Sequence, residues 1–480
     1  MDGRSLRDRA LALFAIDLRS LASFRICAGL LILVDLASRA RLLAENYTDF
    51  GVQPRTAVLA YFEPGFLPSL HMLAGSLRFE VALFVLGALA AALLLVGYRT
   101  WLATALSWLL LDSLHGRNGL VLDGGDHLLR HLLFWSLFLP LGARWSLDAR
   151  RRGAPPSDRV VCSPASAALL LQTAGMFFLT GLLKTGPEWT TDGTAIQYAL
   201  SRRWWLQPFG AWLLANPALP RLLTPSVRWF ELLGPLALFV PFYTTQIRLL
   251  LVPAFWVFMG GLGLGLALNL FPWITGLGML TFVPSPFWDA LGRRARMFRA
   301  DVESGARQGS GVAFRLVQAV VLGLLVLMLF VGAGHVDERL APPRALGDVA
   351  LGLHMKQGWA MYAPSPRRID VWFEHRGRLA NGAPVDLDRA TGGESWTARV
   401  ERAWQDYRFK YYLQKLAEPR WEAQVVPYAQ WLCREWNADR SGGARLDWID
   451  VSAAVQPISL DGEPAEPVET RSVFAGVCPP

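Results

Sequence analysis

Residues 175–189 read GMFFLTGLLKTGPEW, the end of an apolar run that carries a single lysine, Lys184, followed closely by Trp189. A lysine at the rim of a membrane either extends its amine to water or lies in a pocket as a free amine. The next segment, residues 191–204, is polar and aromatic and unsuited to lipid. The sequence therefore predicts that the chain leaves the membrane at Lys184 and forms a pocket there.

The composition is that of a membrane protein. The chain has 480 residues, 53% hydrophobic and only 18% charged, which excludes an ordinary soluble enzyme. Its 20 tryptophans and 26 phenylalanines suit contact with lipid and with the interfacial belts. The net charge of +8 could indicate nucleic-acid binding, but the arginines lie in short clusters between apolar runs. We expect membrane lipids as partners and no nucleic acid.

Apolar runs define the predicted spans, since a transmembrane helix needs about 20 mostly apolar residues. We predict spans near residues 20–38, 77–97, 99–114, 127–142, 164–184, 228–243, 247–268, 269–285 and 313–334. A break at Asn269-Leu-Phe-Pro272 separates the seventh and eighth. The fold class is an all-α polytopic membrane protein of about nine transmembrane helices, with a transmembrane domain over 20–334. Residues 1–19 read as a cytoplasmic interfacial helix and not as a signal peptide.

The arginines predict the orientation. Alternate loops, residues 1–19, 97–100, 143–159, 243–248 and 290–312, hold most of the arginines between spans. Cytoplasmic loops of membrane proteins carry an excess of Lys and Arg. We therefore expect an integral protein of the inner (plasma) membrane whose N-terminus lies in the cytoplasm. Polar and aromatic segments at 47–51, 123–127, 184–204 and 269–272 then share the outer face. A functional cavity is expected to open there.

Residues 335–480 contain no span and predict a small extracytoplasmic α+β domain. Residues 369–375 and 446–451 read as strands, and 395–415 and 422–437 as helices, the second weakened by Pro427. Cys433 and Cys478 share this domain and could form a disulfide in an oxidising compartment. Cys27 and Cys162 are expected to serve packing.

Lys184 is the first candidate for chemistry, because desolvation favours a neutral amine that can act as a base. The alternative is a structural lysine that reaches the headgroups. Asp126 could cap the span that follows it, whereas His127 could bind a ligand. His131 lies one turn beyond His127, but no third metal ligand is evident, and we expect no metal.

Charged residues inside the spans are the next candidates. Arg25, Asp35 and Glu231 are expected to face the bundle interior, where structural pairing and pocket lining are both open. Arg202 and Trp204 belong to a basic and aromatic cluster that could hold a ligand or anchor the loop at the headgroups.

Several separated motifs resemble a known family. Gly181-Leu-Leu-Lys184, Trp189 and Ser201-Arg-Arg-Trp204 are similar to segments of vitamin K-dependent gamma-glutamyl carboxylases. The segments at 24–29, 47–52, 124–127, 140–148 and 358–366 resemble the bacterial branch of that family, the horizontally transferred transmembrane (HTTM) domain proteins. The resemblance covers roughly residues 20–290.

The resemblance implies an activity. In the carboxylases a lysine amine deprotonates reduced vitamin K, which reacts with O₂ to give a stronger base. This base removes a proton from a peptide glutamate, to which CO₂ adds, and the quinone leaves as its epoxide. Lys184 would be the lysine and His127 the family's histidine. Asp126, Trp189, Arg202, Trp204, Glu231 and Arg25 would line the pocket for vitamin K or another quinol. The chain departs from the family at 259–262, where Met-Gly-Gly-Leu replaces a histidine segment.

Two hypotheses follow. The first is a carboxylase-like enzyme that acts on a glutamate-containing peptide, with Lys184 in a cavity beside His127. The second is a non-catalytic membrane protein that binds a quinone or lipid or assists assembly of a surface protein. The second predicts that Lys184 reaches the headgroups or pairs with a carboxylate such as Glu188.

Overall fold

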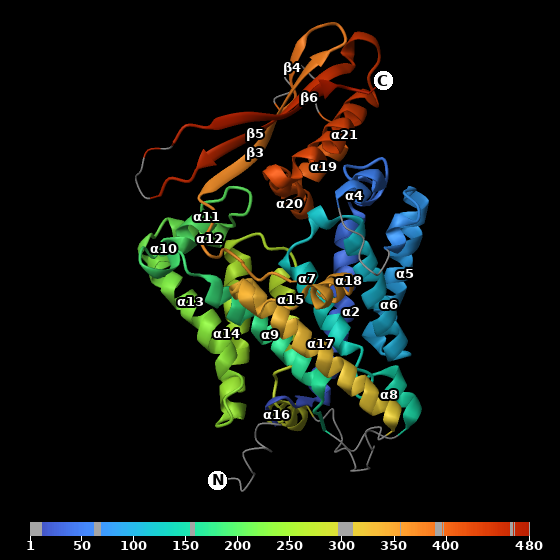
Figure 1. Ribbon diagram of the computed structural model, residues 1–480, viewed down its shortest axis with the longest axis vertical. Helices are drawn as coiled ribbons and strands as arrows, with labels where there is room; N and C mark the ends of the chain where they lie inside the picture. The colour runs from blue at the N-terminus through green and yellow to red at the C-terminus, as the bar shows by residue number, and fades with distance from the viewer. Residues whose placement is uncertain are drawn as a thin grey trace.

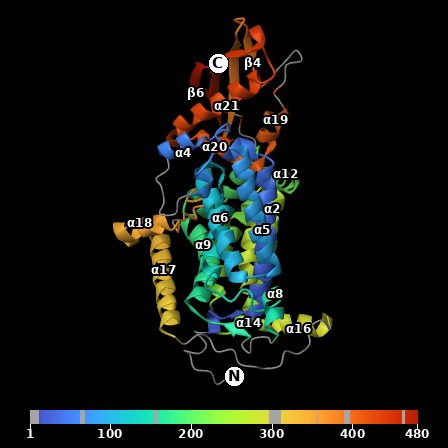
Figure 2. The same cartoon turned by 90° about the vertical axis from the view of Figure 1, so that its right-hand side faces the viewer.

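The computed structural model describes residues 12–61, 69–153, 159–295, 311–355, 357–388, 396, 398–460, 464 and 466–479. A bundle of helices forms the larger part, and a β-sheet with its own helices is stacked on one end of it (Figure 1). The same stacking is seen after a 90° turn of the molecule (Figure 2).

Helices occupy all nine predicted spans. Five of them, among the described residues, are long and apolar enough to cross a membrane: α2 Leu18–Ala40, α5 Leu77–Val96, α9 Pro164–Leu183, α14 Thr244–Gly265 and α17 Val312–Val336. The other four are α6 Thr100–Arg117, α7 Gly124–Ser136, α13 Ala218–Ala237 and α15 Phe271–Leu280. With 10 residues, α15 is only about 15 Å long, half the thickness of a bilayer core. The count of nine spans therefore stays a prediction.

Short helices connect the long ones. They are α3 Leu43–Tyr47, α4 Arg55–Tyr61, α8 Leu147–Arg152, α10 Pro187–Thr190, α11 Ala195–Leu200, α12 Pro208–Leu214, α16 Ser285–Ala295 and α18 Arg344–Gly352. The predicted break is present between α14 and α15, where Asn269 has a φ of 49° and Pro272 lies in the first turn of α15. A proline is tolerated there because its missing N–H has no partner in a first helical turn.

The N-terminal segment differs from its predicted helix. Residues 1–11 lie outside the described residues, and β1 Ile16–Asp17 pairs antiparallel with β2 Val160–Val161. Asp17 then caps α2, since its carboxylate accepts a hydrogen bond of 2.7 Å from the Arg19 backbone N–H. The interfacial helix predicted for this stretch is wrong at its C-terminal end, because the strand pairing and the cap fix an extended backbone before Leu18.

The C-terminal part is a small α+β unit, as predicted. Its sheet is antiparallel in the order β4-β3-β5-β6, with β3 Ile369–Leu379, β4 Pro384–Asp386, β5 Leu446–Pro457 and β6 Glu469–Val477. Its helices are α19 Ala398–Gln405, α20 Tyr407–Leu416 and α21 Val425–Asn437. The sequence interpretation missed β4, which has only 3 residues, and β6, whose residues show no regular alternation.

Two predicted helices of this unit have different limits. The one expected over 395–415 is divided at Asp406, whose carboxylate accepts hydrogen bonds from the backbone of Arg408 and Phe409 and so starts α20 anew. The other begins at Val425, after the 3₁₀ turn Pro419–Gln424, which places Pro427 in a first turn where it does little harm. Cys433 of α21 and Cys478 form a disulfide with their Cα atoms 5.5 Å apart.

Candidate functional site

Lys184 ends α9 in a buried position. Its side chain is 4% exposed, and its Nζ donates to the carboxylate of Glu231 on α13. The same Nζ lies 4.2 Å from the centre of the Trp189 ring. A carboxylate on one side and an aromatic face on the other hold this amine away from water.

A glycine one turn earlier allows this pairing. A Cβ on Gly181 would stand 2.8 Å from the backbone N of Leu232 and 3.0 Å from the carbonyl carbon of Glu231. The backbones of α9 and α13 therefore touch at Gly181, as small residues permit between membrane helices. This contact brings Glu231 within reach of Lys184.

Glu188, the partner named in the second hypothesis, lies elsewhere. Its carboxylate accepts hydrogen bonds from the Ser365 hydroxyl at 2.7 Å and from Nε of Arg368 at 2.6 Å. Burial alone would raise the pKa of Glu188, but these two partners outweigh burial and hold the pKa below its ordinary value. Lys184 does pair with a carboxylate, and that carboxylate is Glu231.

Residues 357–368, which we call the tail segment, run along α9 and past Lys184. The contacts that fix the segment are Gln172 Nε2 to Gln357 Oε1 at 2.6 Å, Thr180 Oγ1 to the Trp359 carbonyl at 3.0 Å, Trp189 Nε1 to the Tyr362 carbonyl at 2.8 Å and Gly186 N to the Pro364 carbonyl at 2.9 Å. Trp359 is only 2% exposed. A segment from beyond the last long helix therefore forms a wall of the Lys184 site.

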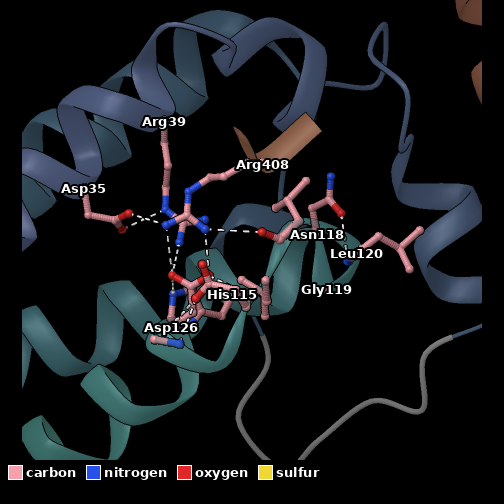
Figure 3. A network of polar contacts seen from close by, with 12 residues as sticks. Asp35, Arg39, His115, Asn118, Gly119, Leu120, Asp126 and Arg408 are labelled. Carbon is pink, nitrogen blue, oxygen red and sulfur yellow. Dashed lines mark hydrogen bonds and ion pairs between the residues drawn. The ribbon is translucent and has the colours of Figure 1, made fainter. Parts of the chain in front are cut away.

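A second polar cluster lies where α20 meets the end of the helical bundle that faces the sheet (Figure 3). Arg408 of α20 contacts Asp126 at 2.6 Å and Asp35 at 2.5 Å. Arg39 contacts the same two carboxylates, at 2.5 Å and 2.7 Å. All four side chains are at most 4% exposed. Two buried arginines thus balance two buried carboxylates, which keeps the cluster neutral.

Asp126 takes part in the cap of α7, as the sequence indicated, but from the third helical position. Asp123 is the N-cap, and Oδ2 of Asp126 accepts a hydrogen bond of 3.0 Å from the Asp123 backbone N–H, which completes a capping box. Burial, together with the neighbouring charge of Asp126, raises the pKa of Asp123 to about 6. On α20, burial lowers the pKa of Lys415 to about 8, while its amine donates to the carbonyls of Gly119 and Leu122.

His127 sits in a third group, on the inner face of α7. Its Nδ1 lies 3.2 Å from Nη2 of Arg130, and its carbonyl accepts from Nδ1 of His131 at 2.6 Å. Arg130 also donates to the carbonyl of His354, whose ring contacts Asp112 at 2.8 Å. Within the described part of the chain, no hydrogen bond or ion pair joins His127 to Lys184.

The remaining residues that were predicted to line the pocket, Arg202, Trp204 and Arg25, lie in different parts of the structure. Arg202 contacts the Tyr362 hydroxyl and lies 5.8 Å from the Trp205 ring, so the tail segment links it to Trp189. Trp204 is half-buried and packs both against the large hydrophobic core and against a smaller cluster that includes Trp205 and Leu266. Arg25 donates to the Trp145 carbonyl at 2.6 Å, near the opposite end of α2, about 20 Å from Arg39 at the helical rise. Among the described residues, no hydrogen bond or ion pair joins Arg25 to Lys184.

The sequence interpretation missed Arg408, Tyr362, Arg39 and Arg130. Arg39 had a local signal, since it lies four residues after Asp35 on one helix. Arg408 had none, because it reaches its partners from a different part of the fold. Tyr362 lies in the family-like segment 358–366, but nothing in that segment indicated its contact with Arg202. Two cavities also lie elsewhere: one is lined by Ile32, His71 and Ser107, the other by Trp101, Ser136 and Arg152, and neither borders Lys184.

Comparison with known proteins supplies the family. The HTTM domain matches residues 14–288, more than half of the chain. No curated protein and no solved structure matches the chain. The HTTM domain defines a family related to vitamin K-dependent carboxylases. The matched range contains Lys184, Glu231, Asp126 and His127, and it ends before the tail segment and α20. The chain therefore belongs to the HTTM-domain family.

Proposed function

We propose that this protein is a quinol-oxidising membrane enzyme of the vitamin K-dependent carboxylase type, with Lys184 as its base. The observation that carries the proposal is the buried pair of Lys184 and Glu231 beside the Trp189 ring. An amine removed from water is easier to keep neutral, and a neutral amine accepts a proton from a quinol hydroxyl.

Glu231 is proposed to exchange a proton with the amine of Lys184. In a site of low dielectric a charged pair and a neutral pair lie close in energy, because desolvation offsets the Coulombic attraction. When Glu231 carries the proton, Lys184 is a free amine. Glu231 is thus proposed to set the protonation of Lys184, and the indole of Trp189 to orient the amine.

The proposed reaction balances with O₂ and CO₂ as co-substrates. Reduced vitamin K, or another quinol, and O₂ give the quinone epoxide and water, and CO₂ replaces the γ-proton of a peptide glutamate. The residues of the chain hold and move the first proton at Nζ of Lys184. The amine of Lys184, the carboxylate of Glu231 and the indole of Trp189 suit the hydroxyl of a quinol. The tail segment must shift away from Lys184 to make room for the quinol ring.

The test is quinol epoxidation by the purified protein in detergent micelles, with reduced vitamin K and O₂. We expect epoxide from the wild type, none above background from Lys184→Ala, and a fall of at least tenfold for Glu231→Gln. A matched control is Lys410→Ala, which removes a lysine of α20 outside this site. Thermal unfolding of each variant separates a lost base from a lost fold. Equal epoxide from wild type and Lys184→Ala would rule out Lys184 as the base.

One observation favours a second function. Lys184 is already paired with a carboxylate and walled by the tail segment, which is what a structural lysine requires. The protein would then bind a quinone or lipid, or assist assembly of a surface protein, without catalysis. Absence of epoxide from wild type with several quinols, with a glutamate-containing peptide present, would support this function.

A further inference from the structure

A cavity opens at the end of the bundle away from the sheet. Its volume is about 190 Å³, and it lies between α6, the end of α7 and α8. It is lined by the first turns of α6, by Ser136 of α7, by the loop 139–143 and by Asp148 and Arg152 of α8. Figures 1 and 2 both show α8 at the end of the molecule opposite the sheet.

The lining contains both apolar and polar side chains. Trp101 and Leu139 are among the apolar ones, and the polar ones are Thr100, Thr104, Ser136, Asp148 and Arg152. The hydroxyls of Thr104 and Ser136 donate to backbone carbonyls of their own helices, so toward a ligand they act as acceptors, and one N–H of Arg152 donates to the Gly142 carbonyl. Trp101 is 69% exposed on the surface of α6, a position that tryptophan favours at the boundary between lipid tails and headgroups. The cavity thus opens at a depth where a ligand would be half in lipid and half in water.

The surroundings are cationic. Arg99 directly precedes α6, Arg150, Arg151 and Arg152 end α8, and all four are exposed. The one carboxylate in the lining, Asp148, already accepts hydrogen bonds from the backbones of Arg99 and Thr100 and from the Thr100 hydroxyl, at 2.6–2.9 Å. These donors hold the pKa of Asp148 below its ordinary value against burial, so Asp148 carries a negative charge. The four exposed arginines outnumber this single carboxylate and leave the rim with a net positive charge.

The size of the cavity decides between ligands. Pockets for whole drug-sized molecules occupy about 300–1,000 Å³, so 190 Å³ is too small for a quinone with its tail. It has the volume of about six water molecules, which suits a glycerol phosphate group whose acyl chains remain outside in the lipid. Arginine recognises phosphate with two parallel N–H bonds.

We propose that this cavity binds the glycerol phosphate headgroup of one anionic phospholipid in the adjoining leaflet. Arg152 contacts the phosphate, the hydroxyls of Thr104 and Ser136 face the glycerol, and the Trp101 ring borders the first acyl carbons. This site is separate from Lys184 and does not depend on the proposed catalytic function.

The experiment is native mass spectrometry of the full chain released from micelles, titrated with phosphatidylglycerol or phosphatidylcholine. We expect one tightly bound phosphatidylglycerol per chain and no comparable phosphatidylcholine. Arg152→Gln is expected to weaken this binding about tenfold, the effect of one charge-assisted hydrogen bond. Ser136→Leu, which fills the cavity without changing the charge, is expected to weaken it as well.

The matched control is Arg150→Gln, on the same helix and equally exposed but outside the lining. Diffuse attraction of arginines to an anionic surface contributes about 1 kcal/mol per residue and would weaken both arginine variants equally, about fivefold. Equal losses would therefore overturn the site. Binding of soluble glycerol 3-phosphate without binding of the phospholipid would overturn the assignment to a lipid.

Discussion

Nη1 of Arg408 donates a hydrogen bond of 2.6 Å to Oδ2 of Asp126, and 282 positions of the chain separate the two residues. Asp126 belongs to the helical bundle and Arg408 to the C-terminal α+β unit. Both side chains are almost fully buried. The buried ion pair of Arg408 with Asp126 therefore anchors the C-terminal unit to the bundle.

Removing this anchor leaves an unbalanced charge. Arg408→Met is expected to destabilise the protein by about 3–5 kcal/mol, because Asp35 and Asp126 then share only Arg39. Thermal unfolding in detergent micelles measures the loss. The double variant Arg408→Met with Asp126→Asn restores neutrality and is expected to recover part of it. An equal loss in the control Arg376→Met, an exposed arginine of β3, would show that the burial of Arg408 has no special role.

Asp123 predicts a dependence of stability on pH. Its pKa of about 6 in the fold exceeds the ordinary value of 3.8, so the folded state binds the proton more tightly than the unfolded state. The stabilisation that Asp123 provides is complete below pH 4 and is lost as the pH rises to about 6. Asp123→Asn keeps the helix cap and is expected to remove this slope. Unfolding midpoints from pH 4 to 7 test it, and an unchanged slope in Asp123→Asn would contradict the assignment.

Two glycines of α9 provide a matched pair. Gly181→Ala forces a methyl group against the backbone of α13 and is expected to cost about 2 kcal/mol or more and to separate Lys184 from Glu231. At Gly175 nothing lies within 4 Å of an added Cβ, so Gly175→Ala is expected to stabilise the protein by about 0.5–1 kcal/mol. Thermal unfolding in micelles compares them. Equal effects in the two variants would mean that α9 and α13 do not touch at Gly181.

The disulfide predicts a redox dependence confined to the C-terminal unit. Cys433 and Cys478 are 45 residues apart, and closing a loop of this length stabilises a fold by about 4 kcal/mol in the chain-entropy account. Reduction, or Cys433→Ala with Cys478→Ala, is expected to expose α19–α21 to limited proteolysis while the bundle persists. A fragment pattern that is the same with and without reductant would contradict this prediction. Cys27→Ala is the control, because Cys27 is a free thiol of α2.

The sequence by itself determined the class of the protein. The apolar runs place helices at every predicted span, because the length of a run and the polarity of its flanks are local properties. The motifs around Lys184, Asp126 and His127 lie inside the matched HTTM range. The small α+β unit was also within reach, since alternating strands are local signals. The disulfide stayed an open possibility, because it joins two cysteines 45 positions apart.

Only the tertiary structure decided the partners. Lys184 pairs with Glu231, 47 residues away, and not with the nearby Glu188, because the contact of α9 with α13 at Gly181 turns these two side chains toward each other. Asp126 binds Arg408 because α20 packs on the end of the helical bundle that faces the sheet. The rotation of one helix against another depends on packing over its whole length, and a sequence pattern specifies which face is buried without specifying which residue it meets.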